Sequence, residues 1–353
     1  MLSKIFGRFS QDLGIDLGTA NTLVYVKDKG IVINEPSVVA INTRTNEILA
    51  IGEMARHMIG KTPSHITATR PLADGVISDF EVAEKMIKYF IERIHRETFA
   101  LLPRPRVVIG IPLEITEVER KAVEDAVLNA GAREVYLIEQ PIAVAIGARL
   151  PIQDSVGSMV VDIGGGTTDI AVISLGGVVT AKSLKIAGDE MTEDISNYAR
   201  EEFNIFLGER TAEEAKIKIG SAMELPEKLE IALRGRDVMT GLPREIIITD
   251  AHIREALKRT IRLMIETIKD TIEQTPAELV ADIYQRGILL SGGGALLRGL
   301  AEAINREIKI PVYVADDPLT SVVRGSGIVV EDLNRLGSVL VPGTKSNSRV
   351  FRR

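Results

Sequence analysis

The sequence predicts an α/β fold built from two related halves, and three observations lead to that prediction. One pattern occurs twice, as GIDLGTANT at 14–22 and as VVDIGGGTTD at 160–169: a β-run closes on an Asp, turns through glycines with a Thr, and continues as β. The residues after each copy, TLVYVKDKGIVIN and IAVISLGGVVT, again read as strand, tight turn and strand. Elsewhere β-runs alternate with helical patterns, which is typical of mostly parallel sheets covered by helices.

The length and composition fit a soluble protein with two domains. The chain has 353 residues, of which 45% are hydrophobic and 26% charged, enough for two full cores. It has no cysteine, which excludes disulfides and thiolate chemistry and fits a cytoplasmic protein, and its four histidines are too scattered to predict a zinc site. A net charge of −6 without a long basic run argues against nucleic acid as a partner. No apolar run reaches membrane-spanning length, and we expect no signal peptide.

In the first half, the strands of the hairpin are followed by short mixed elements that we interpret as a small insertion at about 33–75. Ser78 and Glu81 have the spacing of a capping box, which predicts the start of a helix. Thr116 and Glu119 have the same spacing ahead of a second helix. The other predicted elements of this half are strands at Arg106–Leu113 and Glu134–Ile138 and a helix with Pro141 in its first turn.

The second half repeats the three strands and then holds a more polar insertion at about 188–249. Within it we predict helices at Met191–Phe206 and Thr211–Ala222. A long helix follows, because apolar residues recur at near-helical spacing from Ile253 to Ile272. The half closes with a strand, GILLS, a glycine turn, SGGGALLRG, and a helix from about Ala295.

Three glycine turns, each directly after a β-run, are the candidate ligand-binding elements. A strand that ends at a carboxylate and turns through glycines exposes backbone N–H groups that can bind phosphate, and the Asp beside it can hold a hydrated Mg²⁺. A single GGG turn is equally compatible with a plain strand-to-helix connection. Three such turns at strand ends together predict a cleft between two domains in which a nucleotide binds.

The hairpins and the GGGALLR turn resemble those of the superfamily that contains actin, DnaK-type chaperones and sugar kinases. A longer series is similar, in order, to bacterial actins of the MreB type: DLGTANT, NEPSVVAI, MIGKTP, RPLADGVISDFE, VERKAV, VVDIGGGTTDIAVISLGG, AGDEM, GERTAEEAKIKIG, GRDVMTGLPR, RGILLSGGGALLRGL and DDPLTSVVRGSG. The resemblance spans nearly the whole chain. It implies an actin-like ATPase fold, in which two duplicated ribonuclease-H-like domains, each with a small inserted subdomain, surround a nucleotide cleft.

The resemblance also implies domain boundaries. Residues 1–12 would form an amphipathic, membrane-targeting N-terminus. Domain I would take 13–145 with the first insertion, and domain II would take 146–330 with the second. Residues 331–353 would return to domain I and end in a polar tail.

By resemblance, ATP and Mg²⁺ would be held by four segments of the chain. Asp16 and Asp162 would act on Mg²⁺ through its water molecules. Without the resemblance, Glu213 and Lys216 would be interpreted as a solvated charge pair on a helix. The implied nucleotide-binding residues are Asp16, Gly18, Thr19, Ala20 and Asn21 in the first hairpin, Asp162, Gly164, Gly165, Gly166 and Thr167 in the second, Glu213, Glu214, Ala215 and Lys216 beside the nucleoside, and Gly293, Gly294, Ala295 and Leu296 beneath it.

The predicted catalytic position departs from the pattern of the family. MreB proteins usually carry two acids before the proline of this stretch, the second of which activates the attacking water, whereas this chain has Glu139, Gln140 and Pro141. An amide cannot take a proton at neutral pH, but it can orient water, and phosphoryl transfer depends mainly on positioning and charge stabilisation. We therefore expect slow ATP hydrolysis, with Gln140 and Thr167 positioning the water.

Two apolar clusters predict binding to a membrane surface, one on a short amphipathic helix and one in a proline-rich loop. MreB-like proteins bind bilayers through the same two places. The alternative is a frayed tail and a loop packed on its own domain. Many copies in a filament would add their weak affinities. The clusters are Leu2, Ile5, Phe6 and Phe9 in the helix, and Phe99, Leu101 and Leu102 in the loop, which Arg104 and Arg106 flank.

The resemblance implies an ATP-dependent cytoskeletal protein that polymerises into membrane-associated filaments and determines rod shape by organising cell-wall elongation. The implied partners are further copies of the chain, in paired antiparallel protofilaments, the inner face of the cytoplasmic membrane, a membrane-spanning adaptor and cell-wall synthesis proteins. The alternative is a small-molecule kinase of the same superfamily, acting on a sugar or acetate. We find no candidate base for such a substrate outside the phosphate hairpins.

Overall fold

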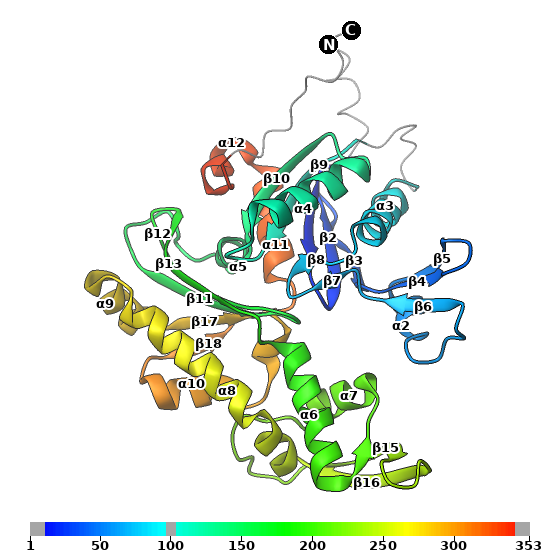
Figure 1. The fold of residues 1–353 in the computed structure, drawn as a ribbon. Coiled ribbons are helices and arrows are strands. Elements are labelled where there is room, and N and C mark those ends of the chain that lie inside the picture. Colours follow the sequence, from blue (N-terminus) through cyan, green and yellow to red (C-terminus); the bar gives the residue numbers. More distant parts are fainter. Residues whose placement is uncertain (1–10, 97–103, 343–353) are drawn as a thin grey trace. The chain divides into compact units, whose positions relative to one another are not determined.

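The structure is a computed structural model that describes residues 11–96 and 104–342. The chain divides into two compact units, whose elements are labelled in Figure 1. The first unit takes the chain up to Ser155, Ser174–Val178 and the chain from Thr320 on, and the second unit takes Val156–Ile173 and Val179–Leu319. The chain therefore returns to the first unit at Thr320, ahead of the return at 331 that the sequence predicted.

The first unit is built on a five-stranded sheet in the order β10-β9-β1-β2-β3. β1 is antiparallel to β2 and parallel to β9, and β9 is parallel to β10. Apolar side chains drive this arrangement: Val107, Val108 and Ile109 of the interior strand β9 are inaccessible to solvent. The strands are β1 (Leu13–Leu17), β2 (Asn21–Val26), β3 (Gly30–Pro36), β9 (Arg106–Ile111) and β10 (Glu134–Glu139).

The second unit repeats this sheet in the order β13-β12-β11-β17-β18. β11 is antiparallel to β12 and parallel to β17, and β17 is parallel to β18. The duplicated α/β halves that the repeated hairpin predicted are therefore confirmed. The strands are β11 (Ser158–Ile163), β12 (Thr168–Ser174), β13 (Gly177–Leu184), β17 (Ile288–Ser291) and β18 (Val312–Val314).

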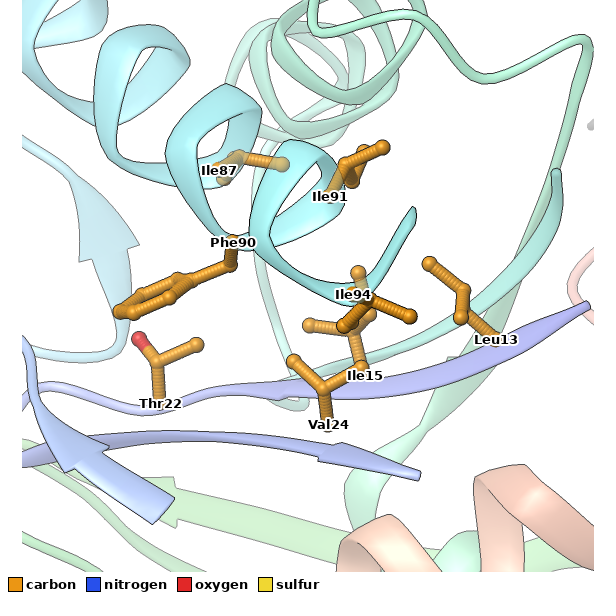
Figure 2. A pocket seen from close by; sticks show the side chains of 8 residues that line it. All are labelled: Leu13, Ile15, Thr22, Val24, Ile87, Phe90, Ile91 and Ile94. Carbon is orange, nitrogen blue, oxygen red and sulfur yellow. The ribbon is translucent and has the colours of Figure 1, made fainter. Parts of the chain in front are cut away.

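Helix α3 (Phe80–Arg96) packs an apolar face on the sheet of the first unit. Figure 2 shows four of its side chains, among them Phe90 and Ile94, on one side of an apolar pocket that β1 and β2 line on the other. The helix is predicted correctly, but its cap is not. The N–H of Val82 donates to the Asp79 carboxylate at 3.1 Å, whereas Ser78 still belongs to the preceding turn, where its N–H donates to the carbonyl oxygen of Pro71.

Two other helices of the first unit follow the predicted signals. α4 (Glu117–Asn129) begins at Thr116, which forms the predicted capping box with Glu119, and Pro141 lies in the first turn of α5. α5 and α11 pack closely, since a Cβ atom on Gly325 would lie 1.8 Å from the carbonyl oxygen of Ala143. The remaining elements are α5 (Gln140–Gly147), α11 (Ser321–Glu331), α12 (Leu333–Leu336) and η2 (Gly337–Val339).

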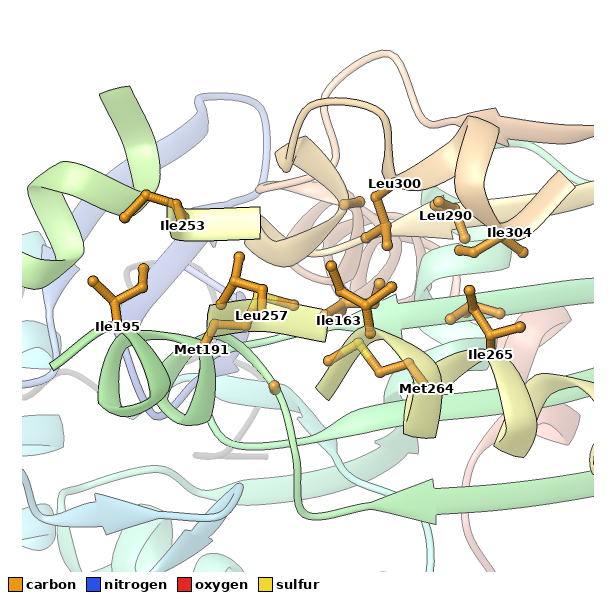
Figure 3. Packing of buried hydrophobic residues seen from close by; sticks show 14 of the residues in the cluster. Ile163, Met191, Ile195, Ile253, Leu257, Met264, Ile265, Leu290, Leu300 and Ile304 are labelled. Carbon is orange, nitrogen blue, oxygen red and sulfur yellow. The ribbon is translucent and has the colours of Figure 1, made fainter. Parts of the chain in front are cut away.

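The core of the second unit gathers on α8 (Asp250–Glu273), whose predicted apolar stripe is buried. Figure 3 shows Leu257 and Met264 of this helix in one apolar cluster with Ile163 of β11, Leu290 of β17 and Leu300 of α10. The closing helix starts later than predicted, because Gly293–Leu296 form the 3-10 turn η1 and α10 begins only at Leu300. The remaining helices are α9 (Ala277–Arg286) and α10 (Leu300–Ile308).

Each unit carries an inserted subdomain. The first holds the sheet β5-β4-β6, helix α2 and the hairpin β7–β8, and the second holds helices α6 and α7 and the sheet β14-β15-β16. The predicted helix at Met191–Phe206 ends early, because Asn204 adopts a left-handed conformation and the next two residues pair with β15. The elements are β4 (Val39–Asn42), β5 (Glu47–Ile51), α2 (Glu53–Arg56), β6 (Ile66–Thr69), β7 (Leu72–Ala73), β8 (Val76–Ile77), α6 (Gly188–Phe203), β14 (Ile205–Phe206), α7 (Glu209–Ile219), β15 (Glu230–Asp237) and β16 (Pro243–Thr249).

Candidate functional site

The first predicted hairpin joins β1 to β2 in the first unit. The N–H of Gly18 donates to the carbonyl oxygen of Asn21 at 3.1 Å, which closes a turn at Thr19 and Ala20. Asp16 stands near the carboxyl end of β1, in register with β2 on one side and with β9 on the other. The structure therefore brings the five predicted residues of this hairpin together.

Ser37, which sequence reasoning missed, fixes the back of this hairpin. It is inaccessible to solvent, its hydroxyl donates to the carbonyl oxygen of Gly18 at 2.6 Å, and its N–H donates to that of Ala20 at 3.0 Å. Because a trans peptide points its N–H opposite to its carbonyl group, the bond to Gly18 turns the N–H of Thr19 away from Ser37. The hydroxyl of Thr19 accepts a hydrogen bond from the N–H of Gly75, in the turn between β7 and β8.

The second predicted hairpin joins β11 to β12 in the second unit. Asp162 is buried near the end of β11, and the N–H of Gly164 donates to the carbonyl oxygen of Thr167 at 2.9 Å. This turn brings together the second set of predicted residues, Asp162, Gly164, Gly165, Gly166 and Thr167.

The first turn of α6 fixes the back of the second hairpin. The N–H groups of Gly188 and Asp189 donate to the carbonyl oxygens of Gly164 and Gly165 at 3.1 and 2.8 Å. The peptide geometry then directs the N–H groups of Gly165 and Gly166 to the face of the turn that lies away from α6. N–H groups presented in this way form an anion-binding concavity.

Thr167 is one of the two predicted water-positioning residues. It is buried, and its hydroxyl donates to the Asp169 carboxylate at 3.1 Å. Because a hydroxyl has one proton and two lone pairs, this bond leaves Thr167 able to accept a hydrogen bond from a water molecule.

Gln140, the other predicted water-positioning residue, lies at the start of α5, directly after β10. It is buried and packs against Gly110 of β9. Because β1, β9 and β10 are parallel neighbours, Gln140 and Asp16 lie at the same edge of the first sheet. Burial also raises the pKa of Glu139, the last residue of β10, and no sequence signal indicated this shift.

Asp16 has the electrostatics expected of a cation site. Burial raises the pKa of its carboxyl from 3.8 to about 7, so the charged form needs a compensating positive charge. Mg²⁺ is suited to such a position, since it keeps several waters and takes one or two carboxylates together with phosphate oxygens. Within the described ranges, no three His, Cys, Asp or Glu side chains gather to hold a metal by themselves.

The residues predicted to flank the nucleoside lie on α7 and η1 in the second unit. The Lys216 ammonium donates to the carbonyl oxygen of Gly188 at 2.5 Å, so it ties α7 to the first turn of α6. Glu214 pairs with Arg210 and Lys218 on the exposed face of α7, as a solvated helical charge cluster. Glu213 and Ala215 lie on the same helix, and Gly293, Gly294, Ala295 and Leu296 form η1, directly after β17.

The predicted membrane residues Leu2, Ile5, Phe6, Phe9, Phe99, Leu101 and Leu102 lie outside the described residues. The chain just after each cluster is described. Arg106 donates to the Asp12 carboxylate through its backbone N–H, Nε and Nη2 at 3.1, 3.1 and 2.5 Å, so it is committed to this pair. None of the helices in the described ranges has the length and apolar character needed to cross a membrane.

The duplicated sheets and the paired glycine hairpins define the class of actin-like nucleotide-binding proteins. The sequence matches the profile of the MreB/Mbl protein family over residues 10–338. It is 49% identical over 344 residues to the cell shape-determining protein MreB of Escherichia coli (strain K12), a match that covers 96% of this chain and 99% of the relative. It is 48% identical over 328 residues to the cell shape-determining protein Mbl of Bacillus subtilis (strain 168), covering 93% and 98%.

Among solved structures, the chain is similar to MreB 5 of Spiroplasma citri bound to AMPPNP. The TM-score is 0.88 at 36% sequence identity, and the match covers 93% of this chain and 98% of the other. The chain belongs to the MreB/Mbl family and has the actin-like ATPase fold. The fold class that the sequence predicted is therefore confirmed.

Proposed function

We propose that this protein is an ATP-dependent, actin-like cytoskeletal protein that polymerises into filaments on the inner face of the cell membrane. The observation that carries the proposal is that two glycine hairpins, one in each unit, have their turn carbonyl groups fixed from behind, so that N–H groups are presented on the other face. A relative bound to AMPPNP, 36% identical, supports a nucleoside triphosphate as the ligand.

The nucleotide would bind through the residues that the sequence indicated. The hairpins of Asp16 and Asp162 would hold the phosphates, and the residues of α7 and η1 would flank the nucleoside. Mg²⁺ would supply charge neutralisation of the phosphates, with Asp16 and Asp162 accepting hydrogen bonds from its water molecules. The raised pKa of Asp16 supports this assignment, because a nearby cation would stabilise its carboxylate.

Hydrolysis would be slow and would depend on positioning. The Gln140 side-chain oxygen can accept one hydrogen bond from the attacking water, and Thr167, which already donates to Asp169, can accept the other. Neither group is basic enough to remove the proton of the water at neutral pH. The proton would therefore leave with the phosphate product, and catalysis would come mainly from orientation and charge stabilisation.

Membrane binding would use the two apolar clusters together. Residues 11–13 and 104–107, which follow the two clusters, are joined by the Asp12–Arg106 pair and by the parallel pairing of Leu13 with Val107. The pairing of these two stretches supports a single membrane-binding face on the first unit, to which both apolar clusters would contribute.

The filaments would organise cell-wall elongation and so determine rod shape, through a membrane-spanning adaptor and cell-wall synthesis proteins. Two relatives that are cell shape-determining proteins, 48% and 49% identical, support this role. We propose paired antiparallel protofilaments as the form of the polymer, and a cytoplasmic protein held at the membrane surface.

Electron microscopy of the purified protein on anionic liposomes tests the proposal. Membrane-bound paired filaments are expected with Mg-ATP. The matched variant lacks residues 2–9 and carries Leu101→Ser and Leu102→Ser, and it should bind ATP as the wild type does but leave the liposomes bare. Dispersed monomers under every condition would contradict the proposal and favour a small-molecule kinase, for which a screen of sugars and acetate is the next step.

A further inference from the structure

The first turn of α6 is a junction at which three parts of the second unit meet. The N–H groups of Gly188 and Asp189 hold the second hairpin, and the carbonyl oxygen of Gly188 accepts the Lys216 ammonium from α7. Space at this point is short: a Cβ atom on Gly188 would lie 3.1 Å from the carbonyl oxygen of Gly164 and 3.6 Å from Lys216 Nζ. The hairpin and α7 are thus linked through a few atoms of α6.

Thr192, one helical turn further along α6, completes this junction. Its hydroxyl donates to the carbonyl oxygen of Gly188 at 3.0 Å and accepts from Lys216 Nζ at 2.8 Å. Thr192 is 5% exposed, so water cannot readily replace either bond. The Lys216 ammonium therefore has two fixed acceptors on α6, and one of them depends on the Thr192 hydroxyl.

We propose that Thr192 is a positioning residue for the nucleotide: its hydroxyl holds Lys216 and the first turn of α6 in the arrangement that fixes the second phosphate hairpin. This proposal rests on the proposed nucleotide site and adds a residue that would not touch the ligand. In the junction, the Thr192 hydroxyl bonds the carbonyl oxygen of Gly188 on α6 and the Lys216 ammonium on α7. Its effect on the ligand is carried by Gly188 and Lys216.

The chemistry of the junction determines which step should suffer. Loss of the Thr192 hydroxyl removes one acceptor of Lys216 and one donor to Gly188, so the peptides that present N–H groups to phosphate become less fixed. Of the proposed water-positioning groups, Gln140 belongs to the first unit, and Thr167, although it lies in the same hairpin, is also fixed by the bond of its hydroxyl to the Asp169 carboxylate. We therefore expect binding of Mg-ATP to weaken while the rate at saturating ATP changes little.

Thr192→Val tests the proposal, because it keeps the shape and removes the hydroxyl. Thr271 offers a matched control, since it is a fully buried threonine on α8 whose hydroxyl donates to the carbonyl oxygen of Thr267, four residues earlier, at 2.8 Å. Thr271→Val therefore loses a comparable hydrogen bond from a threonine hydroxyl to a helix carbonyl oxygen, at a position far along the chain from the hairpin. Thr192→Ser restores the hydroxyl, and Thr192→Ala removes it with less bulk if the valine variant does not fold.

The readouts are the Kd for Mg-ATP, by displacement of a fluorescent ATP analogue, and the kcat and KM of phosphate release. Thr192→Val should raise Kd and KM about three- to tenfold, as expected for the loss of one or two hydrogen bonds, with kcat within about twofold of the wild type. Thr192→Ser and Thr271→Val should bind as the wild type does.

Equal affinities of Thr192→Val and Thr271→Val would overturn the proposal. It would also be overturned if Thr192→Ser bound as weakly as Thr192→Val, because the shape of the side chain rather than its hydroxyl would then matter. A wild-type protein that failed to bind Mg-ATP would instead contradict the proposed function itself.

Discussion

The hydroxyl of Ser37 donates to the carbonyl oxygen of Gly18 at 2.6 Å, and this contact ties the first hairpin to the residue where the first inserted subdomain begins. The second unit has a counterpart: the N–H of Gly188 donates to the carbonyl oxygen of Gly164, and Gly188 is the residue at which the second inserted subdomain begins. In both units, therefore, the donor that fixes the glycine turn comes from the start of that unit's own insertion. A ligand that orders either turn would favour one placement of the neighbouring insertion.

Ser37→Ala should weaken the first hairpin. It removes the donor to the carbonyl oxygen of Gly18 and the partner of Thr22 Oγ1, which lies 2.8 Å from Ser37 Oγ, and Thr22 is buried. We expect a loss of about 1–3 kcal/mol in stability and Mg-ATP binding about three- to tenfold weaker. Thermal melting followed by circular dichroism and displacement of a fluorescent ATP analogue measure the two effects.

Ser326→Ala is the matched control for this substitution. Ser326 is a fully buried serine of the same unit, and its Oγ has no hydrogen-bond partner among the residues that the structure describes. Removing such a hydroxyl should cost no stability, because its desolvation is not compensated in the folded protein. If Ser37→Ala bound Mg-ATP as tightly as Ser326→Ala does, Ser37 would hold only the subdomain and not the ligand site.

Gln140 should control the rate of hydrolysis without controlling affinity. Gln140→Ala removes the oxygen that orients the water, and we expect phosphate release to slow by on the order of tenfold to a hundredfold, which is no more than the low end of what a full general base contributes. Gln140→Glu should speed hydrolysis and make it rise with pH, because only the carboxylate can take a proton.

Single-turnover phosphate release at several pH values measures both changes. Gln153→Ala, at an exposed glutamine of the same unit, is the control and should leave the rate unchanged. An unchanged rate in Gln140→Ala would remove Gln140 from the mechanism, and a fall in ATP affinity alone would reassign it to binding.

The parts of the fold that could be predicted from the sequence are those that local patterns determine. The Thr116 capping box, Pro141 in the first turn of α5 and the apolar stripe of α8 are all in place. Errors occurred where two local signals competed. Ser78 and Asp79 are adjacent residues that can each cap a helix, and the N–H groups of both donate to the carbonyl oxygen of Pro71. The cap is Asp79, whose carboxylate accepts from the N–H of Val82.

The candidate site could be predicted where it consists of consecutive residues, as in the two hairpins. Ser37 and Thr192 could not be found in this way, because each acts through a contact that only the folded chain creates. Ser37 reaches Gly18 across the sheet, and Thr192 meets Lys216 from another helix. The bond between Lys216, which was expected beside the nucleoside, and the first turn of α6 could not be predicted either, because it also joins two helices that only folding brings together.

Gly325→Ala should destabilise the first unit strongly. The new Cβ atom would lie 1.8 Å from the carbonyl oxygen of Ala143, so α5 and α11 would have to move apart, at a cost of about 3 kcal/mol. Gly337→Ala is the control, since nothing lies within 4 Å of the added atom and its backbone is ordinary for alanine. Similar melting temperatures for the two variants would show that the close packing of α5 on α11 is not required.

Asp16 should make the stability of the nucleotide-free protein depend on pH. Its pKa is about 7 in the folded protein and close to 3.8 when unfolded, so the folded protein binds the proton more tightly. Stability should therefore fall as pH rises from about 4 to about 7 and then level off. Asp16→Asn lacks this penalty, so its melting temperature should exceed that of the wild type by an amount that grows across this range. Asp28→Asn, at an exposed turn residue, is the control.

Mg-ATP at pH 8 should stabilise the wild type more than Asp16→Asn, because only a carboxylate gains from the cation. A constant difference between wild type and Asp16→Asn at all pH values would contradict the raised pKa, whereas equal stabilisation by Mg-ATP would contradict the role of Asp16 at the metal.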